Sequence, residues 1–302
     1  MFELDYEAPG GLILGVNEVY TKAEDPFGSL SEYKLGVQTK RWYNDLNTRI
    51  GFNFSNRFKA LGYYNFYKQD YAKTQDFTQD YYVNEFGVGG QIKILPKTWG
   101  FIRYHYGEQD YFSHPSGTGV TDDNDADHNW NRVNAGLIWD TGGKLGGELN
   151  FGYQWLDFDN AVDARNNKYH NVNTWIAGTS VDYEATSTTQ LELNIARTPR
   201  TTNAARNEYY DDTSIGVNLQ QGLPFLSKLT LSGGVRYSNN DYNRQENRRR
   251  KDDNWFADII LNYHIQDWLR AGVGYNYKTK DSNQGEYDYT DNRFMISLGA
   301  AY

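Results

Sequence analysis

The stretch "DWLRAGVGYNYKTKD" (267–281) places two kinds of side chain on alternate positions. The positions of one parity are apolar or aromatic: Leu269, Ala271, Val273, Tyr275 and Tyr277. The positions between them carry arginine, glycine, asparagine and lysine. Successive side chains of a β-strand point to opposite faces, whereas a helix repeats every 3.6 residues. The stretch therefore predicts a strand with one apolar and one polar face.

The same alternation recurs along the chain, for example in residues 255–265, 229–237, 149–155, 133–139 and 50–54. Comparable segments add up to about sixteen strands, within a range of roughly 14 to 18, if a first strand near residues 2 to 8 is included. An even number would put both ends of the chain at the same rim. Residues 59–69 carry tyrosines on both parities and do not select a face.

The connections between these segments alternate in length. Short turns such as "DTGGK" (140–144) and "IQDW" (265–268) are followed by longer polar loops such as residues 112–127 and 243–253. Short turns at one rim and longer loops at the other are typical of up-and-down antiparallel barrels of the outer membrane. We therefore predict an all-β, transmembrane barrel with short periplasmic turns and longer extracellular loops, built as a single domain over residues 1–302.

The polar face carries charged residues on one strand after another. Burying them in a dry core would cost roughly 2–7 kcal/mol for each unsatisfied polar group, so we expect lipid on the apolar face and water on the polar one. The candidates for lining the lumen are Arg49, Arg132, Glu148, Asp182, Glu184, Glu192, Arg236, Asp258, Arg270, Lys278 and Arg293. Salt bridging that stiffens the wall is the alternative interpretation of the same residues.

Aromatic residues of the apolar parity predict two girdles at the membrane surfaces. Their spacing along the strands fits an apolar band about 25 Å tall. The members of the girdles are Trp139, Trp155, Trp175, Trp255, Tyr237 and Tyr275. Trp99 and Trp268 also sit at short turns but have the opposite parity, so they do not fit this pattern.

The composition excludes several classes of protein. A net charge of -9 argues against binding of a nucleic acid, and the absence of cysteine removes thiol catalysis, disulfides and thiolate metal sites. The mean hydropathy is -0.81, and no apolar run reaches the roughly 18 residues of a membrane-spanning helix. The start, "MFELDYEAPGG", lacks the regions of a signal peptide, so we expect that Met1 replaces a removed leader.

Motifs for chemistry are missing from the sequence. No HExxH, GxSxG or phosphate-binding glycine loop is present, so we expect neither an enzyme nor a cofactor. The acidic segment with Asp122, Asp123, Asp125 and Asp127 is a weak metal candidate, but it lacks the glycine and the glutamate of an EF-hand. We favour a solvated loop there. The basic run "RRRK" (248–251) could hold a phosphate, and pairing with acids such as Glu246, Asp252 and Asp253 is favoured instead.

The end of the chain, "NRFMISLGAAY" (292–302), alternates like a membrane strand and closes on an aromatic residue. Such a strand is similar to the C-terminal signal that the barrel assembly machinery reads. The residues concerned are Phe294, Ile296, Leu298 and Tyr302, with tyrosine where phenylalanine is usual.

Three segments resemble the closing strands of the Putative beta-barrel porin 2 family: "ATSTTQLELNIARTPR" (185–200), "DIILNYHIQDWLRAGVGYNYKTKDSN" (258–283) and "YDYTDNRFMISLGAAY" (287–302). The resemblance is clearest after about residue 180. It implies an outer-membrane barrel of Gram-negative bacteria, often associated with exopolysaccharide export, and it carries over no catalytic residue.

We therefore expect a channel for exported polysaccharide or small hydrophilic solutes, in contact with outer-membrane lipid and lipopolysaccharide. A sheath around a partner such as a multihaem cytochrome is one alternative, since the chain itself has no CxxCH motif. A structural or adhesive barrel that acts through its loops is the other. A periplasmic export partner fits the first of these functions.

Overall fold

The computed structural model describes residues 1–25, 39–72, 80–111, 127–140, 144–160, 168–201, 209–223, 226–242 and 249–300. These ranges contain fifteen β-strands and one short 3-10 turn, η2 (Gly285–Tyr287). The strands are β1 (Phe2–Glu7), β2 (Leu12–Asp25), β3 (Thr39–Ser55), β4 (Phe58–Tyr71), β5 (Tyr81–Leu95), β6 (Thr98–Tyr111), β7 (His128–Asp140), β8 (Leu145–Phe158), β9 (Val172–Thr186), β10 (Thr189–Thr201), β11 (Tyr209–Gly222), β12 (Leu229–Tyr242), β13 (Lys251–Gln266), β14 (Leu269–Ser282) and β15 (Tyr289–Ala300). None of the described residues forms a helix that could cross a membrane.

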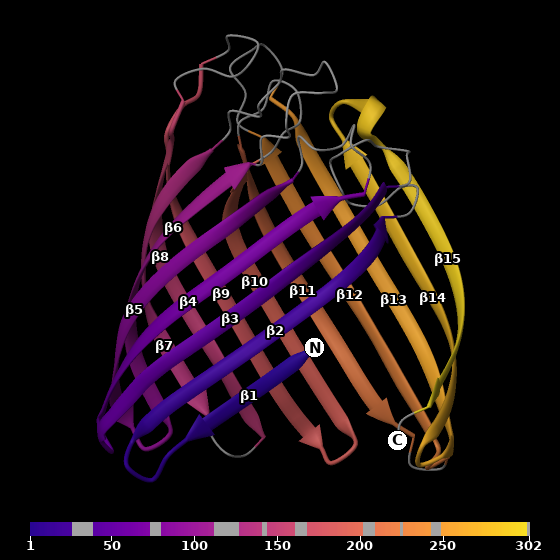
Figure 1. Cartoon of the computed structure of the whole chain (residues 1–302). Coiled ribbons are helices and arrows are strands. Elements are labelled where there is room, and N and C mark those ends of the chain that lie inside the picture. Colours follow the sequence, from indigo (N-terminus) through magenta and orange to yellow (C-terminus); the bar gives the residue numbers. More distant parts are fainter. Residues whose placement is uncertain are drawn as a thin grey trace. The chain divides into compact units, whose positions relative to one another are not determined.

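The strands form one sheet in which their spatial order is their order in the chain, from indigo β1 to yellow β15 (Figure 1). Each strand pairs with its chain neighbours, so the predicted up-and-down arrangement is confirmed. The first strand expected near residues 2 to 8 is β1. The described residues thus hold fifteen strands, one fewer than the predicted sixteen and within the predicted range. Strands such as β3 are 17 residues long, whereas about ten residues suffice to cross a membrane. Longer strands use more of the chain, so fewer of them fit in the same length of sequence.

The register keeps residues of one kind in continuous rows across neighbouring strands. Ile259 of β13 lies opposite Tyr275 of β14, which lies opposite Phe294 of β15. A slip by one residue would exchange the two faces of a strand, so the apolar pattern specifies this register strongly. We call the side of the sheet with this row the apolar face and the other side the polar face. The polar face holds the odd-numbered residues of β1–β6 and β15 and the even-numbered residues of β7–β14.

The burial of side chains is reversed with respect to a water-soluble protein. Phe294 and Ile296 on the apolar face are 83% and 90% exposed, whereas Arg250 and Lys280 on the polar face are 1% and 2% exposed. A large exposed apolar surface is unfavourable in water and needs another partner. This arrangement is the one expected of strands whose apolar face contacts lipid.

Two compact units make up the sheet. The first comprises residues 1–137, 151–176 and 200–209, and the second comprises residues 138–150, 177–199 and 210–302. The boundaries between them fall within strands β7–β11 and not within linkers. Each unit is described by itself below.

Candidate functional site

A buried carboxylate, Glu85 on β5, organises the polar face of the first unit. Arg132 Nη2 donates to both of its oxygens at 2.9 and 2.8 Å, and Trp130 Nε1 donates at 3.1 Å. Asn65 Nδ2 adds a bond of 2.9 Å, and His105 Nδ1 lies 3.1 Å from Oε1. A buried charge is tolerated when it is paired and hydrogen-bonded in this way. The Glu85 network therefore ties four strands together, from β4 to β7.

Two glycines, which have no Cβ atom, let the rings of this network pack directly on the backbone. A Cβ atom on Gly107 would lie 2.2 Å from the Trp130 ring, and one on Gly87 would lie 2.7 Å from the His105 ring. The His105 ring in turn stacks on Tyr63, with 5.5 Å between ring centroids. Sequence reasoning missed Glu85; glycines of the polar parity on β5 and β6 were the available signal for rings packed over the backbone.

Four tyrosines form a second feature, the tyrosine ladder, across β3, β4, β5 and β6. The ring centroids of Tyr43 and Tyr67 are 6.0 Å apart, those of Tyr67 and Tyr81 5.7 Å, and those of Tyr81 and Tyr111 5.4 Å. All four residues lie on the polar face. Arg41 covers one end of the ladder, 5.7 Å from the Tyr43 ring centroid. The polar face thus carries a continuous aromatic strip.

A polar cavity of about 290 Å³ lies between β1 and β4. Its wall combines two carboxylates, three amides, one guanidinium and one aromatic ring: Glu3, Asp5, Asn17, Asn47, Asn65, Arg49 and Tyr63. Arg49 Nη2 donates to Asp5 Oδ2 at 2.5 Å. Because Tyr63, Asn65 and Tyr67 follow one another on the polar face of β4, the cavity borders the tyrosine ladder.

All eleven residues expected to line the lumen lie on the polar face, and several of the cations are paired. Arg132 contacts Glu85, Arg49 contacts Asp5, Arg293 contacts Asp291 at 2.8 Å, and Arg236 lies 3.9 Å from Asp212. The Lys278 amine lies 5.5 Å from the centre of the Phe256 ring, and the Arg270 side chain lies beside Gly299. These pairs agree with the wall-bridging interpretation, and lining of a lumen by the same charges stays a prediction.

The predicted acids lie mostly among amides. Glu192 accepts from Asn194 at 2.7 Å and from Asn218 at 3.1 Å, and Glu148 accepts from Asn150 at 3.0 Å. The remaining predicted acids have amide, glycine or acidic neighbours in register: Asp182 opposite Glu192, Glu184 opposite Gln190, and Asp258 opposite Gly234 and Asn276.

The sequence matches the Putative beta-barrel porin 2 family over residues 14–302. The chain belongs to this family. It is an outer-membrane β-barrel and resides in the bacterial outer membrane, as the predicted resemblance implied. No curated protein matches the chain.

Two solved structures of outer-membrane iron transporters have a similar fold, and a channel protein is also among the matches. The ferric citrate transporter FecA is 13% identical with a TM-score of 0.53, and the match covers 98% of this chain and 54% of that one. The FrpB iron transporter of Neisseria meningitidis is 10% identical with a TM-score of 0.50, covering 96% and 55%. The channel DcaP of Acinetobacter baumannii is 14% identical with a TM-score of 0.49, covering 98% and 99%. The chain spans about half the length of the two iron transporters.

In this porin-family barrel the predicted girdle residues lie on the apolar face, and their place at the membrane surfaces stays a prediction. Trp155, Trp175 and Trp255 are 41%, 45% and 48% exposed. The remaining members also lie there: Tyr237 against Trp255, Tyr275 against Phe294, and Trp139 over Gly147. Trp99 has the opposite parity and lies on the polar face, where its ring contacts the amines of Lys59 and Lys93, at 5.1 and 5.7 Å from the ring centroid. Trp268 remains exposed at its turn.

The terminal strand of the barrel presents Phe294, Ile296 and Leu298 on its exposed apolar side. Tyr302, the last residue of the predicted assembly signal, lies outside the described residues.

Most of the weak metal candidate also falls outside the described ranges, namely Asp122, Asp123 and Asp125. Asp127 Oδ1 instead accepts a bond from the Tyr111 backbone at 2.7 Å. Among the described residues, no cluster of histidines and carboxylates has the geometry of a metal site.

The basic run of the barrel pairs with acids. Arg250 binds Asp252, while Arg249 and Lys251 both contact Asp241 at 2.5 and 3.3 Å. Asp253 accepts from Tyr237 instead. Arg248 and Glu246 lie outside the described residues.

Proposed function

We propose that this protein is a non-catalytic outer-membrane channel. Exported polysaccharide, or small hydrophilic solutes, pass through it without an energy source. Membership of the porin family supports the channel. The tyrosine ladder beside the cavity of Asp5, Arg49 and Tyr63 is the observation that supports the saccharide.

Saccharides combine two chemistries that this surface matches. The C–H groups on one side of a sugar ring pack on aromatic faces, and its hydroxyls donate to and accept from planar polar groups. The ladder supplies the faces, while Asn47, Asn65 and the Arg49–Asp5 pair supply the polar groups. Binding sites in proteins commonly combine a few converging polar groups with aromatic walls.

The Glu85 network keeps long side chains out of the path that a solute would take. Because Glu85, Arg132 and Trp130 bond to one another, their long side chains are held against the wall. Side chains restrained in this way do not extend freely into the lumen.

Conductance in planar bilayers tests the proposal. We expect a steady ionic current from the purified protein, interrupted briefly when a glucose oligomer is added. Tyr67→Ala removes one rung of the ladder and should shorten the blockades roughly threefold to tenfold. Tyr64→Ala is the matched control, because Tyr64 lies on the apolar face of the same strand and its ring contacts Phe86.

Other outcomes separate the alternatives. A current without saccharide blockades would support the channel and contradict polysaccharide as its substrate. A red cytochrome that co-purifies and suppresses the current would favour the sheath. Negligible conductance of the protein alone, with phenotypes only from loop deletions, would favour a structural or adhesive barrel.

A further inference from the structure

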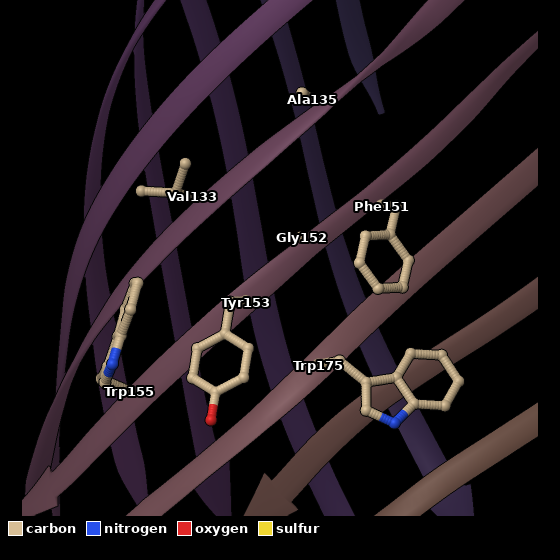
Figure 2. Close-up of a pocket in the computed structure, with 7 residues that line it drawn as sticks. All are labelled: Val133, Ala135, Phe151, Gly152, Tyr153, Trp155 and Trp175. Carbon is tan, nitrogen blue, oxygen red and sulfur yellow. The ribbon is translucent and has the colours of Figure 1, made fainter.

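A groove of about 660 Å³ opens on the lipid face of β7, β8 and β9, within the first unit (Figure 2). Its lining is apolar or aromatic throughout: Val133, Ala135, Phe151, Gly152, Tyr153, Trp155 and Trp175. The groove has no part in the passage of solutes, because all the side chains that line it belong to the apolar face; Gly152 contributes backbone only.

Four aromatic rings line the groove, and the smaller residues Val133, Ala135 and Gly152 complete the lining. Phe151 and Trp175 are stacked, with centroids 5.9 Å apart and planes inclined by 22°. Tyr153 and Trp155 support each other at 5.0 Å. Ala135, whose side chain is a single methyl group, lies with Val133 at the end of the groove away from Trp155 and Trp175. Rings that contact one another before a ligand arrives lose little freedom on binding, so the groove is preorganised.

The polar atoms of the groove lie on one side. In Figure 2 the hydroxyl of Tyr153 and the indole nitrogens of Trp155 and Trp175 point the same way, and Val133 and Ala135 lie at the opposite end. Trp155 is near the end of β8 and Trp175 is near the start of β9, the two strand ends that the connection 159–171 joins. Longer connections lie on the extracellular side of outer-membrane barrels, so this end of β8 and β9 puts the polar end of the groove near the headgroups of the outer leaflet.

We propose that this groove holds one acyl chain of lipopolysaccharide, the lipid of the outer leaflet. The apolar end accommodates the chain, and the hydroxyl and indole N–H groups meet the ester and sugar oxygens at its head. A second copy of this protein is the competing occupant, and the test below distinguishes it from the lipid. The proposal does not depend on what passes through the channel.

Native mass spectrometry of the full chain in detergent tests this site, with Kdo2-lipid A as the probe and phosphatidylethanolamine as the competing lipid. We expect the wild-type protein to retain one molecule of lipid A after delipidation. Ala135→Phe places a ring in the apolar end of the groove and should weaken retention by about tenfold. Ala257→Phe is the control, since it adds the same ring to the lipid face of β13 and should retain lipid A as the wild type does.

Folding of each variant is checked by its heat-dependent shift on a denaturing gel. If Ala135→Phe does not fold, Phe151→Ala opens one wall of the groove and should give the same loss. Equal retention by the wild type and both groove variants would overturn the proposal. So would equal retention of phosphatidylethanolamine, or a stable dimer whose formation Ala135→Phe abolishes.

Discussion

Asp182 on β9 lies directly opposite Glu192 on β10, so two carboxylates share one row of the polar face. Neither residue has an ion-pair partner within the described ranges. Like charges directly opposite one another destabilise a sheet. Asp182→Asn should therefore raise the free energy of unfolding by about 0.2–1 kcal/mol, with a larger effect at low salt than at high salt. Unfolding by urea in detergent at two salt concentrations measures it.

Glu184→Gln serves as the control for this change. Glu184 lies opposite the neutral Gln190, so its neutralisation relieves no direct repulsion. A similar gain from both variants would mean that net charge, and not the facing pair, limits stability.

Arg132→Met should be strongly destabilising, because it leaves the buried Glu85 carboxylate without its cation. Breaking a buried pair costs about 3–5 kcal/mol, and the remaining bonds from Trp130 and Asn65 reduce this to roughly 2–4 kcal/mol. Unfolding midpoints in detergent provide the measurement. Adding Glu85→Gln to Arg132→Met should recover part of the loss.

The matched comparison is Arg49→Met. The Arg49 and Asp5 side chains are 43% and 62% exposed, so this pair should contribute only about 0–1 kcal/mol. If the two arginine variants lost the same stability, the Glu85 network would have no special role.

Gly107→Ala should destabilise the barrel by roughly 1–3 kcal/mol, because the new methyl group would overlap the Trp130 ring. The near-UV circular dichroism of the indole should change with it. Gly90→Ala lies on the same strand pair with nothing within 4 Å of the added carbon, so it should be close to neutral. Stability unchanged in Gly107→Ala would show that the ring can move away freely.

Ile259 and Ile260 test the facing of the sheet, since they are neighbours in β13 on opposite faces. Ile259→Lys puts a charge into lipid and should cost about 2–4 kcal/mol near the midplane. Ile260→Lys faces the polar side, next to Ser232 and Gly274, and should cost distinctly less. Refolding into lipid vesicles with denaturant titration measures both variants. The reverse order of costs would mean that the two faces had been exchanged.

The alternation seen in residues 267–281 and repeated along the chain, together with the lengths of the connections, was sufficient to predict the strands, their two faces and the class of membrane protein. This works because a strand in a barrel wall meets lipid on one side and water on the other, so every second residue records its surroundings. The prediction was weakest in residues 59–69. There Tyr64 faces lipid while Tyr63 and Tyr67 face the lumen, and aromatic residues suit both environments.

The Glu85 network, the tyrosine ladder and the groove over Ala135 were not predictable in the same way. Each gathers residues from three or more strands: Glu85 and Arg132 are 47 positions apart in the chain. Which of them meet depends on the register between neighbouring strands, and no single strand encodes that register. The sequence by itself thus determined the direction in which each side chain points, and the tertiary structure decided which side chains touch.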